Sequence, residues 1–161
     1  MGCAARDSAA RDGSPLADSL HAPIADTLRG PGTREGTWQG PDQRATWRAT
    51  LDGARVTQLD EFAFFTDSTR AMRQFQFDSL GLLRTVREER VQTVWGNKAT
   101  PDTLQTVIEL EWQSDSLVRS AKRLNGAERL VQPYEVDNLR AHAEDLVRTA
   151  RAGTPTRPAA H

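Results

Sequence analysis

Glu109 and Glu111 are the acidic residues whose spacing best suits chemistry. They are two positions apart in a segment where apolar and polar residues alternate, so a β-strand would point both carboxylates to one face. Such a pair could bind a cation or act as acid and base in a hydrolase. A neighbouring segment with Arg84, Arg87 and Arg90 favours another explanation, namely cross-strand ion pairs on a solvated face. We predict this ladder and keep the hydrolase as the weaker hypothesis.

Other nucleophiles and bases are few, because the chain has one cysteine, Cys3, and three histidines. Two of the histidines, His21 and His161, lie near the ends of the chain, outside the expected regular elements. Only His142 falls in a regular element, beside an apolar stripe, where we expect a partly exposed surface histidine. No glycine-rich phosphate loop is present, and one cysteine cannot form an internal disulfide. The sequence therefore predicts no catalytic, cofactor-binding or metal site.

Composition indicates one domain of ordinary size, because 161 residues with 37% hydrophobic content can form one core. The 21 basic and 22 acidic residues nearly balance, which argues against a nucleic-acid-binding module. No apolar run approaches the roughly 20 residues that a membrane-spanning helix needs.

Turn signals at short intervals predict a run of antiparallel hairpins beyond Gly40. Asp52-Gly53 and Asn125-Gly126 suit type I′ turns, and Asp78 to Gly81 marks another turn. About seven strands are expected, which we place around Trp47–Leu51, Val56–Phe65, Phe75 and Phe77, Leu82–Trp95, Leu104–Gln113, Leu117–Leu124 and Ala127–Gln132.

A C-terminal helix is expected to begin at Pro133 and to end near Gly153. Its apolar residues recur every three or four positions and form a stripe that should lie across one sheet face, made of Val136, Leu139, Ala143, Leu146 and Ala150. The fold class is therefore mainly β (α+β), a curved antiparallel meander with one C-terminal helix. We assign residues 1–40 to a flexible tether, 41–153 to the domain and 154–161 to a frayed tail.

Gly36-Thr37-Trp38 is similar to the start of lipocalin-like barrels, in which a tryptophan plugs the closed end. A barrel usually takes about eight strands, so Trp38 would have to begin another strand; otherwise it packs at the sheet edge. The resemblance implies a small apolar ligand in a cavity. The candidate lining residues are Phe62, Phe64, Phe75, Phe77, Ile108 and Trp112.

Met1-Gly2-Cys3, followed by a polar segment rich in proline and glycine, resembles a bacterial lipoprotein after removal of its signal peptide. That resemblance implies a lipidated Cys3 and a spacer that holds the domain away from the membrane surface. N-myristoylation of Gly2 is the alternative, but its motif requires Ser or Thr where this chain has Arg6.

The order of hairpins over about residues 45 to 150 resembles small bacterial envelope lipoproteins of unknown function, built as a β-meander with a helix. The features that match are the Trp47 strand, the Asp52-Gly53 turn, Phe75-x-Phe77-Asp78, Glu109-x-Glu111-Trp112 and the terminal helix. The resemblance implies a periplasmic, lipid-anchored protein, with a secreted soluble protein as the alternative. We expect a non-catalytic module that binds or supports an envelope protein; the alternative is a lipocalin-like carrier of a small apolar ligand.

Overall fold

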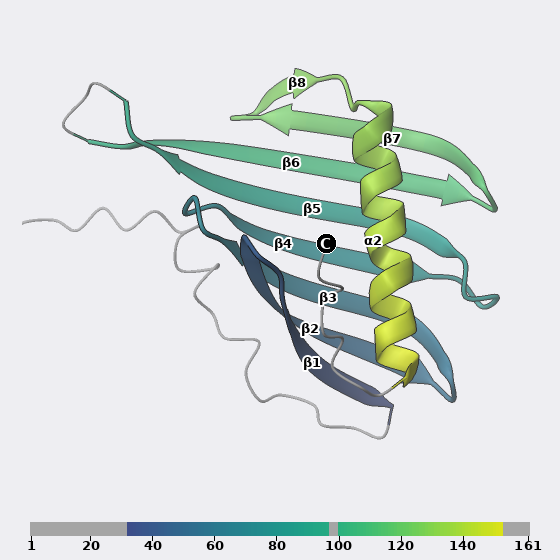
Figure 1. Ribbon diagram of the computed structural model, residues 1–161. Helices are drawn as coiled ribbons and strands as arrows, with labels where there is room; N and C mark the ends of the chain where they lie inside the picture. Colours follow the sequence, from purple (N-terminus) through teal and green to yellow (C-terminus); the bar gives the residue numbers. More distant parts are fainter. Residues whose placement is uncertain (1–31, 97–99, 153–161) are drawn as a thin grey trace, which may run out of the picture.

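The computed structural model describes residues 32–96 and 100–152, which form one sheet and one long helix (Figure 1). Every strand pairs antiparallel with its neighbours in sequence, in the order β1 to β8. The elements are β1 Thr33–Gln39, β2 Gln43–Asp52, β3 Arg55–Phe65, β4 Arg70–Phe77, β5 Leu83–Val94, β6 Asp102–Gln113, β7 Ser116–Leu124, β8 Ala127–Arg129 and α2 Pro133–Ala152.

The predicted mainly β meander with one C-terminal helix is confirmed, with eight strands instead of about seven. Within the described ranges β1 and β8 are the two edges of the sheet and do not pair with each other. The sheet therefore stays open, and the barrel that an eighth strand could have formed is not closed.

The additional strand, β1, occupies the last part of the segment assigned to the tether. Its sequence, Thr-Arg-Glu-Gly-Thr-Trp-Gln, shows no apolar alternation, and its position depends on a tertiary contact. Gly36 lies opposite Trp47 of β2, and a Cβ on Gly36 would lie 2.6 Å from Cε2 of that indole. The glycine thus lets a buried tryptophan pack directly on the strand backbone. Residues 1–31 of the predicted tether lie outside the described residues.

The two predicted type I′ turns have different outcomes. Asn125 and Gly126 both have positive φ, 49° and 80°, as a type I′ turn requires. In the β2–β3 hairpin Asp52 pairs with Arg55, so the loop residues are Gly53 and Ala54, and of these only Gly53 has positive φ. This pattern is typical of a type II′ turn, and the prediction for Asp52-Gly53 was wrong by one position.

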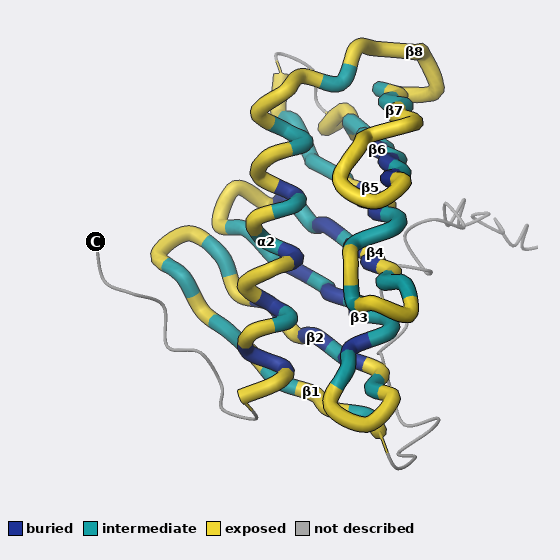
Figure 2. The backbone as a smooth tube through the Cα atoms, turned by 90° about the vertical axis from the view of Figure 1, so that its right-hand side faces the viewer, coloured by how far each residue is buried: buried dark blue, intermediate teal, exposed yellow. Residues whose placement is uncertain are grey.

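The helix α2 crosses one face of the sheet and buries the predicted stripe (Figures 1 and 2). It begins at Pro133 as expected, while Gly153 and the predicted tail lie outside the described residues. Leu139, Ala143 and Leu146 are buried against core side chains of the strands, which include Leu59, Phe75, Val86 and Leu110. None of the described helices is long and apolar enough to cross a membrane.

Candidate functional site

The six residues predicted to line an apolar cavity lie on two opposite faces of the sheet. Phe62 and Phe64 of β3 lie on the face away from α2, with their rings edge to face and 4.7 Å between centroids. The other four belong to the helix-covered face and pack in its core or against it; they are Phe75, Phe77, Ile108 and Trp112. One cavity cannot be lined by all six, because Phe62 and Phe64 point to one face of the sheet and the other four point to the opposite face.

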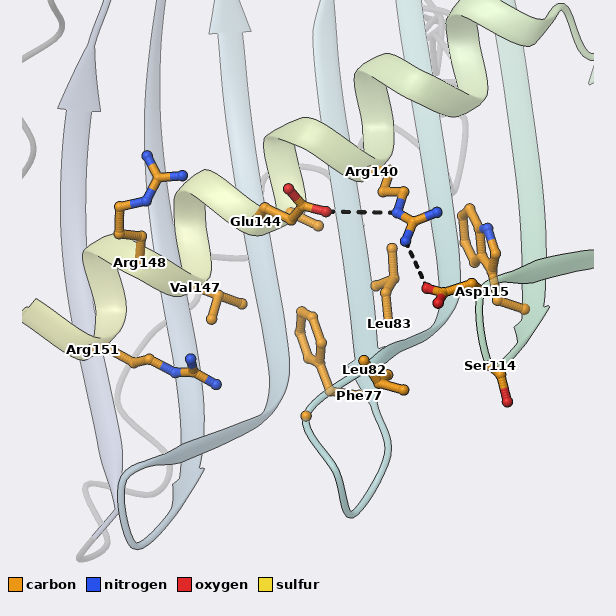
Figure 3. Close-up of a pocket in the computed structure, with 13 residues that line it drawn as sticks. Phe77, Leu82, Leu83, Ser114, Asp115, Arg140, Glu144, Val147, Arg148 and Arg151 are labelled. Atoms are coloured by element: carbon orange, nitrogen blue, oxygen red, sulfur yellow. Dashed lines mark hydrogen bonds and ion pairs between the residues drawn. The ribbon is translucent and has the colours of Figure 1, made fainter.

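A groove lies on the helix-covered face, between α2 and the β4–β5 and β6–β7 turns (Figure 3). Its volume is about 380 Å³, within the range of small-molecule sites. The sheet and turns contribute Phe77, Gly81, Leu82, Leu83, Trp112, Ser114 and Asp115, and α2 contributes Arg140, Ala143, Glu144, Val147, Arg148 and Arg151.

The floor of the groove is apolar and only partly covered. Phe77, Leu83 and Val147 pack on the edge of the hydrophobic core and remain partly exposed, whereas Trp112 behind them is buried. Leu82 is 39% exposed at the mouth. The groove therefore exposes apolar side chains beside the packed core. An apolar ligand group could cover these side chains without any rearrangement of the core.

The rim of the groove is charged, and its two ends differ. At one end, Arg140 forms ion pairs with Asp115, at 3.0 Å, and with Glu144, at 3.6 Å (Figure 3). At the other end, Arg151 projects toward the groove, and no ion pair joins it to an acidic side chain within the described part of the chain. A Cβ on Gly81 would lie 3.5 Å from Nη2 of Arg151, which places the guanidinium over the β4–β5 turn.

The wall formed by α2 is fixed to the sheet at both ends. Near its N-terminus, Glu135 accepts a hydrogen bond from the Gln132 backbone N–H at 2.8 Å and pairs with Lys122 of β7 at 2.6 Å. Burial alone would raise the pKa of Glu135, but this hydrogen bond and Lys122 hold it below its usual value. At the other end, Arg34 of β1 donates to the carbonyl oxygens of Ala150 and Arg151 at 2.6 and 2.7 Å. These contacts satisfy carbonyls that a helix end leaves unpaired.

The middle of α2 is held by a buried charge cluster, made of Glu61, Arg73, Glu88 and His142. Arg73 lies between the two glutamates, with Nη1 2.7 Å from Glu61 and Nε 2.6 Å from Glu88. His142 Nε2 lies 2.7 Å from the same Glu61 oxygen. Because a carboxylate can only accept, Nε2 of His142 is the donor in this hydrogen bond. The cluster thus links α2 to three adjacent strands.

Glu61 is the centre of this cluster, with a side chain that is 0% exposed. Its other oxygen accepts a hydrogen bond from Trp38 Nε1 at 2.7 Å. Burial alone would raise the pKa of Glu61, but His142 and Arg73 outweigh it and hold the pKa below its usual value. The two oxygens of Glu61 accept hydrogen bonds from Trp38, Arg73 and His142. This carboxylate therefore stabilises the packing of β1, β4 and α2 on β3.

His142 was predicted to be a partly exposed surface histidine, and its side chain is 25% exposed. Sequence analysis identified neither a partner for His142 nor a role for Glu61. A detectable signal existed, because Glu61 and Arg73 each lie between core residues two positions away, and Glu88 follows the core residue Val86 at the same spacing. Trp38 lies on the edge strand β1 of the open sheet, as the alternative to a lipocalin-like barrel proposed. Its indole N–H also donates a hydrogen bond to Glu61 of this cluster.

The acidic pair of β6 lies on the face away from α2. Arg87 pairs with Glu109 at 2.6 Å, and Arg123 of β7 approaches the same carboxylate at 3.5 Å. Glu111 is in register with Thr85 and Arg119. Arg90 belongs to the other face, where it pairs with Glu88 at 3.0 Å. The predicted ladder therefore exists around Glu109, with Arg87 and without Arg90.

Within residues 32–96 and 100–152, no group of three or more His, Cys, Asp or Glu side chains could hold a metal ion. Cys3, the predicted lipidation site, lies outside the described residues. Comparisons of the chain with protein-family models, with curated proteins and with solved structures gave no match.

Proposed function

We propose that this protein is a non-catalytic binding module of the bacterial cell envelope, anchored through a lipidated Cys3, and that the groove beside α2 is its binding site. The observation that supports the site is the partly exposed apolar floor of Phe77, Leu83 and Val147 inside a charged rim. Soluble domains rarely leave apolar side chains together in a concavity unless something binds there.

A binding role agrees with how the protein uses its ionisable residues. The acids and bases of the charge cluster that could do chemistry, Glu61, Arg73 and His142, are bonded to one another and hold α2 on the sheet. The Glu109 carboxylate on the other face is engaged by Arg87. These are structural uses of groups that an enzyme would direct at its substrate.

The core packing favours a surface site over an enclosed carrier cavity. Phe75, Ile108 and Trp112, three of the predicted lining residues, are buried against α2 and its neighbours. The groove lies beside this packed core and is bounded by the helix and two turns. The enclosed cavity of a lipocalin-like barrel therefore has less support than an open surface groove.

The groove can be tested by site-specific photocrosslinking in living bacteria. A benzophenone amino acid at Glu144, which lines the groove, should form an adduct detectable by mass spectrometry. The same amino acid at Ala141 is the matched control, because it is exposed on the same helix but does not line the groove. Equal labelling at both positions, or none at Glu144, would argue against the groove as the binding site.

The anchor can be tested by expressing the protein from its native locus and separating membrane and soluble fractions. The proposal expects the wild type in the membrane fraction with an acylated Cys3, and the Cys3→Ser variant in the soluble fraction. Recovery of both proteins in the soluble fraction would contradict lipid anchoring without affecting the groove.

A further inference from the structure

We propose that the groove binds a single-chain fatty-acid anion, with the hydrocarbon chain on the apolar floor and the carboxylate at Arg151. This inference rests on the proposed function, since it names the chemistry of the ligand for the same site. It follows from the shape of the floor, from the asymmetry of the charges on the rim and from the scarcity of hydrogen-bonding groups on the floor.

The floor has the form of a strip. Phe77 and Leu83 lie along the sheet side, and Val147 lies opposite them on α2 (Figure 3). The lining residues of the helix run from Arg140 to Arg151, a separation of about 16 Å at the rise of an α-helix. A strip that is long, narrow and open on one side fits a linear chain better than a compact ring system.

The charges of the rim give this strip a direction. The carboxylates of Asp115 and Glu144 surround Arg140 at one end, where an added anion would be repelled. At the other end Arg148 pairs with Asp145 at 3.0 Å, and both side chains are largely exposed. Arg151 is exposed beside the β4–β5 turn at this end of the apolar floor, and a guanidinium in that position can bind a carboxylate through paired hydrogen bonds.

A peptide fits this groove less well than an acyl chain. The strands beneath the groove already pair with their neighbours through their backbone groups. The floor itself consists of hydrocarbon side chains and one indole ring. A peptide backbone laid on it would lose its hydrogen bonds to water and gain few in return, whereas a hydrocarbon chain has none to lose.

Dodecanoate and its uncharged analogue dodecanol are the probes that test this inference, titrated below their solubility or micelle limits and followed by NMR chemical shifts of groove residues. We expect dodecanoate to bind, with the largest shifts at Leu83 and Val147. Octanoate should bind more than tenfold more weakly, because each buried methylene contributes about fourfold in affinity.

The variant Arg151→Gln should weaken dodecanoate binding at least tenfold and leave dodecanol binding unchanged. Arg129→Gln is the matched control, because Arg129 is an exposed arginine on β8, outside the groove. Val147→Asp should abolish binding of both probes, and the circular dichroism spectrum and melting temperature will show whether each variant is folded.

The outcomes separate this inference from the proposed function. Equal binding of dodecanoate and dodecanol, with no effect of Arg151→Gln, would overturn the anion while the groove remained a binding site. Failure of both probes to bind, together with a Glu144 photoadduct of another mass, would overturn the fatty acid and keep the site. Failure of both probes and absence of any Glu144 adduct would overturn both proposals.

Discussion

Replacing Glu61 by leucine should destabilise the protein strongly, although leucine is apolar and the site is buried. The substitution removes the acceptor for three donors, Trp38, Arg73 and His142, each 2.7 Å from a carboxylate oxygen. Arg73 would keep one of its two glutamates, inside the core, where the side chain is 8% exposed. Removal of one partner from a buried ion pair costs about 3 to 5 kcal/mol.

This loss corresponds to a fall in melting temperature of about 10 to 20 °C for a domain of this size. Urea unfolding followed by tryptophan fluorescence gives the free energy directly. Asp60→Asn is the matched control, because Asp60 is the neighbouring acid on the opposite face of β3 and is more exposed. It should change the free energy of unfolding by less than about 1 kcal/mol.

The pH dependence of the free energy of unfolding provides an independent test of the role of Glu61. Glu61 has a lower pKa in the folded protein than the ordinary 4.5. Its ionisation therefore stabilises the fold above that ordinary value, and this contribution is lost as the pH falls through the lowered pKa. The difference in stability between wild type and Glu61→Gln should be largest near neutral pH and should shrink below pH 4.5.

A loss below about 1 kcal/mol for Glu61→Leu would refute the reasoning, because a buried arginine that loses one of its two carboxylate partners should cost more than that. The combined replacement of Glu61, Arg73 and Glu88 by Leu, Met and Leu supplies the complementary result. Removing all three charges should recover much of the lost stability. A triple variant less stable than Glu61→Leu would show that the charges themselves, and not their pairing, stabilise the fold.

Three further substitutions have defined outcomes. Leu139→Ala should lower the free energy of unfolding by about 2 to 5 kcal/mol, since it truncates a buried contact between α2 and the sheet. Gly36→Ala should cost about 1 to 3 kcal/mol, because the new methyl group overlaps the indole opposite it. Replacing Glu109 and Glu111 together by Gln should leave the fold and binding nearly unchanged, since the ion-pair partners of Glu109 are exposed arginines and Glu111 lies on the same face.

Each of these variants has a control. Arg140→Ala, one position from Leu139 in an exposed ion pair, should hardly change the melting temperature; an equal effect would mean that α2 is not packed as described. Gly96→Ala adds a methyl group in open space and should be neutral. A calcium-dependent rise in melting temperature that disappears in the Glu109/Glu111 double variant would show a metal site instead of an ion-pair ladder.

The sequence predicted the parts of the fold that depend on local patterns. Alternation in Leu104–Gln113 and the stripe of α2 each depend on near neighbours, and both appear as expected. The segment of β1 was assigned to the tether because Gly36 and Arg34 are weak strand residues by themselves. Their roles, making space for Trp47 and capping α2, depend on partners that are distant in sequence.

The site was less predictable for the same physical reason. The groove is formed by two turns and the C-terminal half of α2, so no short segment of sequence contains it. Phe77 and Trp112 were identified as apolar candidates, but no arginine of α2 was identified as part of a site. Register and bulges decide which side chains share a face, and a bulge separates Gln76 from Phe77 at this position.

The hydrogen bond from the Arg34 side chain to the Ala150 carbonyl at the end of α2 also constrains how the chain folds as it is synthesised. The two partners are 116 residues apart, whereas each hairpin of the sheet forms between neighbours in sequence. The meander can therefore assemble while the ribosome is still translating, with one apolar face open to solvent. That face is covered only when the last helix emerges. Until then the nascent sheet depends on its surroundings for protection from aggregation.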